Sequence, residues 1–201
     1  MTPSLLSILV LFIIAFVSNA TPFFGASYTL LATTVLFAYG FTISAFVLVV
    51  LVTAAGASIA KLVLYYGGKG AKGRLQRNRN VNLLDRWLQH KSFLAVVFVT
   101  AVIPGLPLDD YVYIVAGANG AKLARLFTVT FFAKVVKGFI EIGVEFATFG
   151  RIFPETGLFG LSRLATSIIL SVVFLLLGIV FFKLDMEKLL SRLRPKPAQP
   201  I

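Results

Sequence analysis

The chain has 201 residues, of which 58% are hydrophobic and 13% are charged, and its mean hydropathy is +0.93. Soluble domains carry about 25% charged residues, so most of this surface must face lipid and an ordinary soluble protein is excluded. The net charge of +11 would suggest nucleic acid in a soluble chain, but in a membrane protein it is typical of cytoplasmic loops. We therefore expect no nucleic-acid partner. The chain lacks Cys and has one His, so neither a metal site nor a cofactor is expected.

The first apolar segment predicts a transmembrane helix over residues 1–19. No charged side chain occurs from Pro3 to Val17, and the polar, helix-breaking run Ser18 to Pro22 follows. Ser18 and Ala20 resemble a signal-peptidase site, but a positively charged start is missing. An uncleaved first helix is therefore favoured over a removed signal peptide.

Residues 23–60 carry no charge, and this stretch of about 38 residues is too long for one span of about 20. Gly25 and Gly40 interrupt its first part, whereas residues 45–60 are a continuous apolar run. Residues 20–66 are thus predicted to form a re-entrant hairpin, to about Gly40, and then a transmembrane helix.

A basic segment follows at residues 67–91, where seven cations outnumber the single acid Asp85: Lys69, Lys72, Arg74, Arg77, Arg79, Arg86 and Lys91. The excess of positive charge predicts a cytoplasmic loop. Basic residues beside an interfacial aromatic ring suit contact with anionic lipid headgroups, a role we assign to Lys61, Arg74, Arg77 and Trp87. A merely solvated loop is the alternative, and His90 is given no chemical role.

Residues 92–120 are apolar but cannot form one regular helix. Pro104 and Pro107 remove two backbone donors, Gly105 lies between them, and Asp109 and Asp110 follow directly. Irregular backbone and carboxylates at membrane depth require an interior, polar environment. The segment is therefore predicted to be a re-entrant hairpin that lines an internal space.

Charge also favours a hairpin over a crossing at residues 92–120. A single crossing would place Lys122, Arg125 and the basic tail outside, whereas a hairpin keeps them cytoplasmic. The remaining chain then comprises a transmembrane helix at 121–150, an external loop with a last transmembrane helix at 151–184, and a cytoplasmic tail at 185–201.

The helix at 121–150 contains a stripe of four charges. At about 100° per residue they fall within roughly 80° of one another, on one face: Lys134, Lys137, Glu141 and Glu145. Each would cost about 2.5–3.5 kcal/mol at the centre of a lipid-facing helix, so the stripe must face the interior. Together with Asp109 and Asp110 it predicts a substrate or ion path, and a salt-bridge ladder that fixes packing is the alternative. We hypothesise that Lys134 or Lys137 pairs with one of the two aspartates.

Two blocks resemble a known family. The first contains Gly56-Ala57, Lys61, Tyr65-Tyr66, Gly68 and Gly70, and the second contains Ile103-Pro104-Gly105, Ala116-Gly117 and Phe127. Their order and spacing resemble the G-A-x-x-G-D-x-x-x-Y-x-x-G-R-x-x-G and R-F-I-P-G-x-R … A-G … F blocks of the DedA/VTT family, also called SNARE-associated membrane proteins. The likeness covers about residues 15 to 150.

The resemblance implies an all-α integral membrane protein, a polytopic bundle with two re-entrant helical hairpins that face each other from opposite membrane sides. Asn19 to Gly40 would be the first hairpin, and the breaks would lie at Pro22, Gly25, Pro104, Gly105 and Pro107. It also implies that the protein moves lipids between leaflets, as a flippase or scramblase of phospholipids or polyprenyl phosphates. The chain departs from the family pattern where Ala101 and Pro107 replace two Arg residues, where Lys61 replaces an Asp, and where no acid accompanies Thr21-Pro22.

Several functions stay open at this point. An ion-coupled small-molecule exporter could use the same two hairpins, and a non-transporting scaffold would need only the charged ladder. An enzyme is disfavoured because one interfacial His is poor material for acid–base catalysis. The expected partners are membrane lipids, with protons or another ion, in a prokaryotic plasma membrane. The small residues Ala54 to Ala60 suit helix packing within one chain or in a homodimer.

Overall fold

The computed structural model describes residues 3–21, 28–75, 93–102 and 108–152, with positions 169 and 176. The regular secondary structure of these residues is helical throughout. Seven helices are described: α1 (Leu5–Ala20), α2 (Tyr28–Tyr39), α3 (Ile43–Gly70), α4 (Lys72–Leu75), α6 (Phe93–Val102), α7 (Leu108–Asn119) and α8 (Leu123–Ile152). The expected all-α class is confirmed for this part of the chain. Most of the expected last helix at 151–184, the tail at 185–201, and five expected backbone breaks lie outside it: Pro22, Gly25, Pro104, Gly105 and Pro107.

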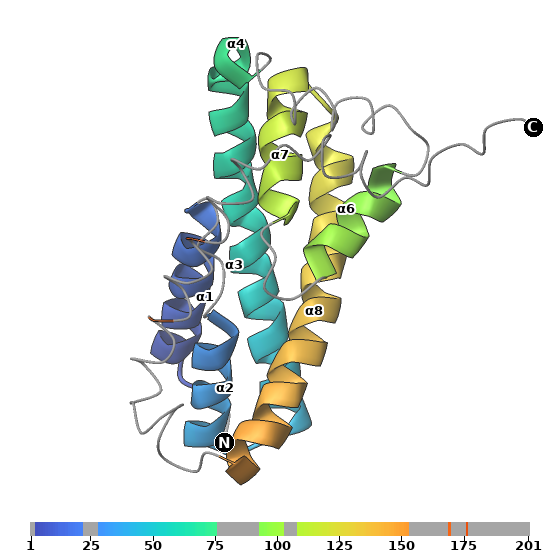
Figure 1. Cartoon of the computed structure of the whole chain (residues 1–201). Helices are drawn as coiled ribbons and strands as arrows, with labels where there is room; N and C mark the ends of the chain where they lie inside the picture. Colours follow the sequence, from blue (N-terminus) through green and yellow to red (C-terminus); the bar gives the residue numbers. More distant parts are fainter. Residues whose placement is uncertain are drawn as a thin grey trace, which may run out of the picture.

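Two long helices, α3 and α8, form the axis of the bundle (Figure 1). At 1.5 Å per residue α3 spans ~42 Å and α8 ~45 Å, which exceeds the ~30 Å of a bilayer's hydrocarbon core. Within the described residues, α3 is the one helix both long and apolar enough to cross a membrane. Thr42 caps the start of α3, and its hydroxyl accepts a hydrogen bond from the Ala45 amide at 3.2 Å.

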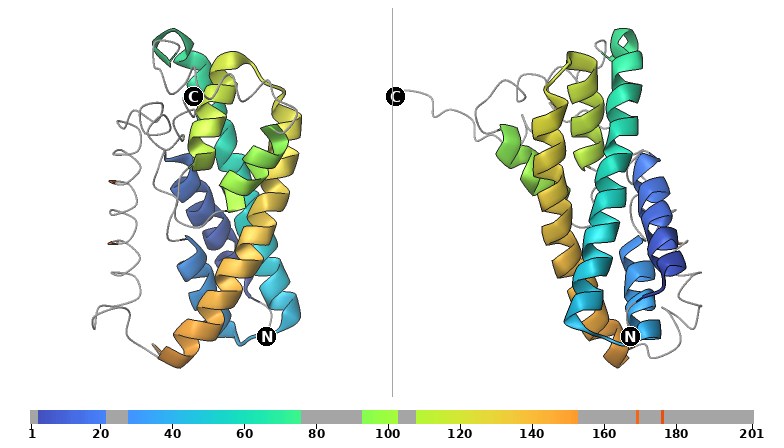
Figure 2. Two further views of the ribbon diagram at one scale, coloured as in Figure 1. Left: turned by 45° about the vertical axis from the view of Figure 1, so that its right-hand side comes forward. Right: turned by 180° about the vertical axis from the view of Figure 1, so that it is seen from behind.

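Four shorter helices lie beside this axis in two pairs (Figures 1 and 2). In one half of the bundle α1 and α2 run antiparallel. Ser7 near the start of α1 is accordingly hydrogen-bonded to Tyr39 at the end of α2 (2.8 Å). In the other half α6 runs toward the middle and α7 runs back. At 10 to 16 residues these four helices are only ~15–24 Å long, so none of them spans the bundle.

The boundaries refine the sequence-based expectations. The break expected near Gly40 lies between α2 and α3, where Gly40 adopts a φ of +79°, a conformation that favours glycine. α3 continues to Gly70 rather than ending near residue 66, so the basic segment expected at 67–91 begins as helix. The helix expected at 121–150 is α8.

Glycines allow α3 to approach its neighbours closely. A Cβ on Gly68 would overlap the backbone of Ile114 in α7, and one on Gly117 would overlap the backbone of Tyr65 in α3. On the side toward α1, a Cβ on Gly56 would lie 2.6 Å from the Phe12 carbonyl oxygen. The small-residue face of α3 therefore packs within one chain, as in other tight membrane helix pairs.

Two larger apolar clusters form most of the core, one in each half of the bundle, and a small third cluster joins Ala15, Tyr28 and Ala57. The first joins α1, α2, α3 and α8 through Leu11, Ala32, Leu36, Ala45, Val49, Val50 and Ile142. The second joins α3, α6, α7 and α8 through Leu64, Tyr65, Val97, Val112, Tyr113, Ala116 and Leu126. Along α3, residues 51–63 separate the two clusters, and the buried Lys61 lies in this intervening stretch.

Gly68→Ala should destabilise the protein, because the new methyl group must push α7 away from α3. Overpacking of this kind costs about 1–3 kcal/mol, which outweighs the ~1 kcal/mol gained in helix propensity. Gly67→Ala is the matched control, since a Cβ there meets nothing within 4 Å and should leave stability equal or higher. Thermal unfolding in detergent measures both, and equal melting temperatures would contradict the close approach.

Candidate functional site

A cluster of buried charges joins α3, α7 and α8 in the middle of the bundle. Lys61 of α3 forms ion pairs with Asp109 (3.1 Å) and with Asp110. Lys134 of α8 forms a second ion pair with Asp109 at 2.7 Å. Both aspartates belong to the first turn of α7, where the helix dipole favours negative charge. Asp109 thus bridges two lysines that belong to different long helices.

Burial makes this pairing necessary. The exposed fractions are 2% for Lys61, 4% for Asp109 and 3% for Lys134. An isolated ion at such a position loses its hydration without compensation, whereas paired ions recover much of this cost from each other. The cluster therefore holds α3, α7 and α8 in one arrangement.

The stripe of α8 continues the polar interior toward α2. One turn beyond Lys134, Lys137 is 8% exposed and lies 3.6 Å from Glu141 in an i,i+4 ion pair. One turn further, the oxygens of Glu145 lie 2.8 Å from the hydroxyl of Thr29 and 2.7 Å from that of Thr33. These side chains follow one another from α7, along α8, to α2. We call this series of polar groups the polar path.

Tyr28, the first residue of α2, lies between the two ends of this path. It is 2% exposed, and within the described part of the chain its hydroxyl has no hydrogen-bond partner. Four charged groups act on it electrostatically: Glu141, Asp109, Lys61 and Glu145. A buried hydroxyl without a partner beside several charges is a site that water or a ligand atom can satisfy.

The structure brings the predicted path residues together. The hypothesised contact between the stripe and an aspartate is present as the Lys134–Asp109 pair. The other stripe residues make separate contacts: Lys137 pairs with Glu141, and Glu145 contacts α2 rather than the aspartates.

Lys61 differs from its expected place. We grouped it with Arg74 as a headgroup contact, but Arg74 is exposed at the end of the bundle and Lys61 is buried in the cluster. The reason is that two carboxylates of α7 neutralise it in the interior. Arg77 and Trp87 lie outside the described residues.

Sequence reasoning also missed Tyr28, Thr29 and Thr33. Tyr and Thr in an apolar helix satisfy themselves in many ways, so their types alone indicate no site. The sequence gives only an indirect signal. The stripe contains two lysines and two glutamates, and with the two nearby aspartates the carboxyl groups outnumber these lysines. At least one carboxyl group therefore needs a neutral partner.

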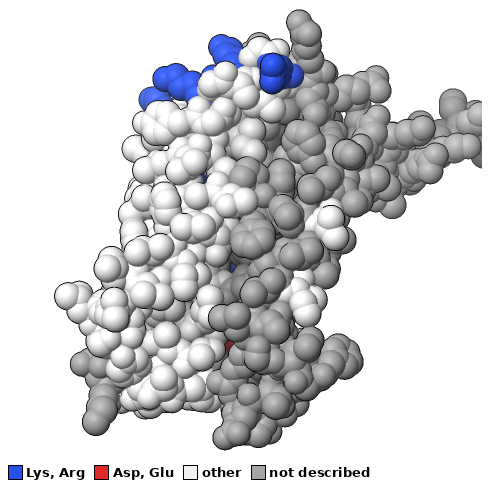
Figure 3. Space-filling view, turned by 90° about the vertical axis from the view of Figure 1, so that its left-hand side faces the viewer, with Lys and Arg blue, Asp and Glu red and all other residues white. Residues whose placement is uncertain are grey.

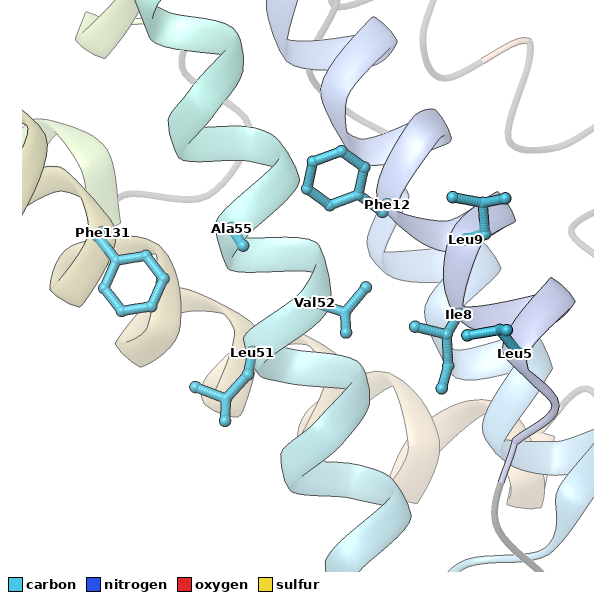
Figure 4. A pocket seen from close by; sticks show the side chains of 8 residues that line it. All are labelled: Leu5, Ile8, Leu9, Phe12, Leu51, Val52, Ala55 and Phe131. Carbon is cyan, nitrogen blue, oxygen red and sulfur yellow. The ribbon is translucent and has the colours of Figure 1, made fainter.

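An apolar groove lies apart from the charges, between α1, α3 and α8 (Figure 4). Its volume is about 480 Å³, and apolar side chains alone line it: Leu5, Ile8, Leu9, Phe12, Leu51, Val52, Ala55 and Phe131. Such a lining offers nothing to a charged headgroup. The ionic cluster is therefore the candidate site.

Among the residues that the structure describes, exposed charge gathers at one end of the molecule. Figure 3 shows Lys and Arg at that end and a nearly uncharged face below it. The exposed basic residues where α3 and α4 end and α8 begins are Lys69, Lys72, Arg74, Lys122 and Arg125. Large apolar side chains are exposed elsewhere, for example Leu5 at 82% and Ile43 at 76%, as lipid contact requires.

An apolar exterior, a long apolar helix and a buried ionic interior define a helical membrane protein. The family model of the VTT domain matches residues 6–144, which is more than half of the chain. The protein belongs to the VTT domain family, the DedA/VTT family that the sequence motifs resemble. Comparison with curated proteins and with solved structures gave no match.

Lys61→Met should lower the free energy of unfolding by about 3–5 kcal/mol, because it removes a cation that pairs with two buried carboxylates. The double variant Lys61→Met/Asp110→Asn should recover much of this loss, since Asp109 keeps Lys134 as its partner. Unfolding in detergent for the two single variants and the double variant gives the coupling energy. Additive effects of the two substitutions would argue against a direct Lys61–Asp110 interaction.

Proposed function

We propose that this protein moves lipids with phosphate headgroups between the two leaflets of a membrane. The observation that carries the proposal is the set of three lysines buried in the middle of the bundle: Lys61, Lys134 and Lys137. A phosphate that crosses hydrocarbon needs cations along its route. The headgroup would pass along the polar path while the acyl chains remain in the bilayer.

The carboxylates have a defined part in this mechanism. Between transport events Asp109 and Asp110 together neutralise Lys61 and Lys134. A lipid phosphate can take the place of the Asp109 carboxylate beside these lysines, because both groups present oxygen atoms with negative charge. The exchange then leaves both lysines paired, and the displaced Asp109 carboxylate must be hydrated or take up a proton.

The two pairs of short helices support a route from each leaflet. We propose that α6 and α7 form a re-entrant hairpin, and that the segment between α1 and α3 forms a second one from the opposite side. Each of these helices is shorter than the ~30 Å hydrocarbon core. α2 and α7 both begin near the middle of the bundle (Figure 1). Asp109 and Asp110 lie in the first turn of α7, and Thr29 near the start of α2 contacts Glu145. Broken helices that meet at the midplane are a common device for binding polar substrates.

The basic end of the molecule supports an orientation. Loops rich in Lys and Arg remain on the cytoplasmic side, so the ends of α3 and α7 and the start of α8 are assigned to the cytoplasm. The Thr42 end of α3 then faces the outside. A plasma membrane of a prokaryotic cell fits this arrangement.

A non-transporting scaffold is the second candidate. It is favoured by one observation: each of the three buried lysines is already paired with a carboxylate. A scaffold and a transporter differ in what neutral substitutions do, because a scaffold has no transport rate to lose.

Lys134→Gln should reduce the rate of fluorescent-phospholipid translocation in proteoliposomes at least tenfold, which corresponds to ~1.4 kcal/mol in the barrier. The physical reason is the loss of a cation from the path. The measurement compares lipids with phosphate-containing and uncharged headgroups, and only the former should depend on Lys134.

Lys69→Gln is the matched control, since Lys69 is exposed at the basic end of α3 and its loss should leave the rate within about twofold, or ~0.4 kcal/mol. Elution and melting behaviour verify that both variants are folded. An unchanged rate in folded Lys134→Gln would reject the proposed role of the lysines, and a wild-type rate equal to that of empty vesicles would support the scaffold.

Single cysteines should report the topology, because the natural chain contains none. In intact cells a membrane-impermeant thiol reagent should label Thr42→Cys but neither Lys72→Cys nor Lys122→Cys, since all three positions are exposed and the last two lie at the basic end. Labelling after cell lysis verifies that each cysteine is reactive. Labelling of Lys122→Cys in intact cells would mean that residues 93–119 cross the membrane and do not turn back.

A further inference from the structure

Thr33 contacts two oxygen atoms, one of them in Glu145, but its hydroxyl carries only one hydrogen. Thr33 Oγ1 lies 2.7 Å from Glu145 Oε2 and also 3.0 Å from the carbonyl oxygen of Thr29. A hydroxyl group carries one hydrogen, so it cannot donate fully to both oxygens. If the carboxyl group were ionised, one of these two short contacts would set lone pairs against each other.

Other threonines indicate where the hydrogen of Thr33 goes. Five donate to the carbonyl oxygen four residues earlier in the chain: Thr21, Thr34, Thr53, Thr100 and Thr128. Thr33 makes the same contact to Thr29. Its hydroxyl is then committed as a donor to the backbone and offers Glu145 only an acceptor.

A proton on Glu145 satisfies every atom of this group. Glu145 Oε2–H donates to Thr33 Oγ1, and Thr33 Oγ1–H donates to the Thr29 carbonyl oxygen. Thr29 Oγ1–H, at 2.8 Å, donates to Glu145 Oε1. Thr29 is the second residue of α2, and this contact with Glu145 is the hydrogen bond that its hydroxyl donates.

The balance of charge along the polar path also favours a proton on Glu145. Lys61 and Lys134 are paired with Asp109 and Asp110, and Lys137 is paired with Glu141. Among the side chains that the structure describes, no Lys or Arg forms an ion pair with Glu145. Within this described set the path has three cations for four carboxyl groups, and the set is neutral only if one carboxyl group holds a proton.

We propose that Glu145 is a proton-binding site that fastens α2 to α8 while the proton is bound. Loss of the proton forces Thr33 to turn its hydroxyl toward the carboxylate and to release the Thr29 carbonyl oxygen, at the first turn of α2. It also adds a negative charge to a neutral path. Both changes weaken the attachment of α2 to α8.

The surroundings contain few other groups that could exchange the proton. On α8 itself Glu141 and Lys137 are the charged neighbours, and α2 presents Tyr28. α1, and α3 before Lys61, contain no ionisable side chain. Lys61 and Asp109 face Tyr28 from α3 and α7, at the other end of the path. The neighbouring carboxyl group of Glu141 is therefore the alternative holder of the proton.

Infrared spectroscopy of the whole protein in lipid distinguishes these two carboxyl groups. The spectrum of wild type minus Glu145→Gln at neutral pH should contain the carbonyl stretch of a protonated carboxylic acid. The matched control, Glu141→Gln, should leave that band in place and remove carboxylate bands only. In Thr33→Val the band should persist but move to higher frequency, because the acid loses its hydrogen-bond acceptor.

Each other result overturns the proposal. Carboxylate bands in the wild type minus Glu145→Gln spectrum would mean that Glu145 is ionised, and loss of the acid band in Glu141→Gln would place the proton there. If Glu145→Gln fails to fold, the Thr33→Val spectrum still decides, since an unshifted or absent acid band rejects the contact. These spectra require no lipid transport, so the proposed proton site and the proposed transport function can each fail alone.

Discussion

The cost of burying ions in an apolar bundle is the constraint on which the rest of this structure depends. Lys61 lies in the long apolar helix α3 with 2% of its surface exposed, and it is tolerable there because Asp109 and Asp110 meet it. Those aspartates are available because α7 begins in the middle of the bundle rather than at its end. The first turn of α7 thus supplies the negative charges that the buried lysine needs.

Close backbone packing supports the same arrangement. Lys61 reaches α7 at its first turn, and Gly68 and Gly117 let the two backbones touch further along. In a membrane, where apolar burial gives helices little reason to associate, such contacts and buried polar pairs are the main attractions. The ionic cluster and the glycine contacts thus fix α7 against α3 at two points, which sets both its position and its rotation.

The sequence predicts features that lie within one helix, such as a charged face, but it does not predict most contacts between two helices. The stripe of α8 was predictable because Lys134 and its neighbours share one face at helical spacing. Its contact with Asp109 followed from the need to pair buried charges. The place of Lys61 did not follow, since a lysine close to a basic loop is typical of an interfacial residue and its partner lies 49 positions away. The two threonines around Glu145 were also hidden, because threonine in a helix usually bonds its own backbone.

The geometry also explains how a tightly paired cluster can remain exchangeable. Asp109 bridges Lys61 and Lys134, so two cations depend on one carboxylate, while Asp110 gives Lys61 a second anion. Any group that displaces Asp109 must present negative oxygen to both lysines at once, which a phosphate does through its several oxygens and a water molecule does not. Because α7 is anchored to α3 beyond its first turn, its aspartates can yield without the helix leaving the bundle. Under the proposed function, a path with one shared carboxylate would be stable when empty and selective for an anion that replaces this carboxylate.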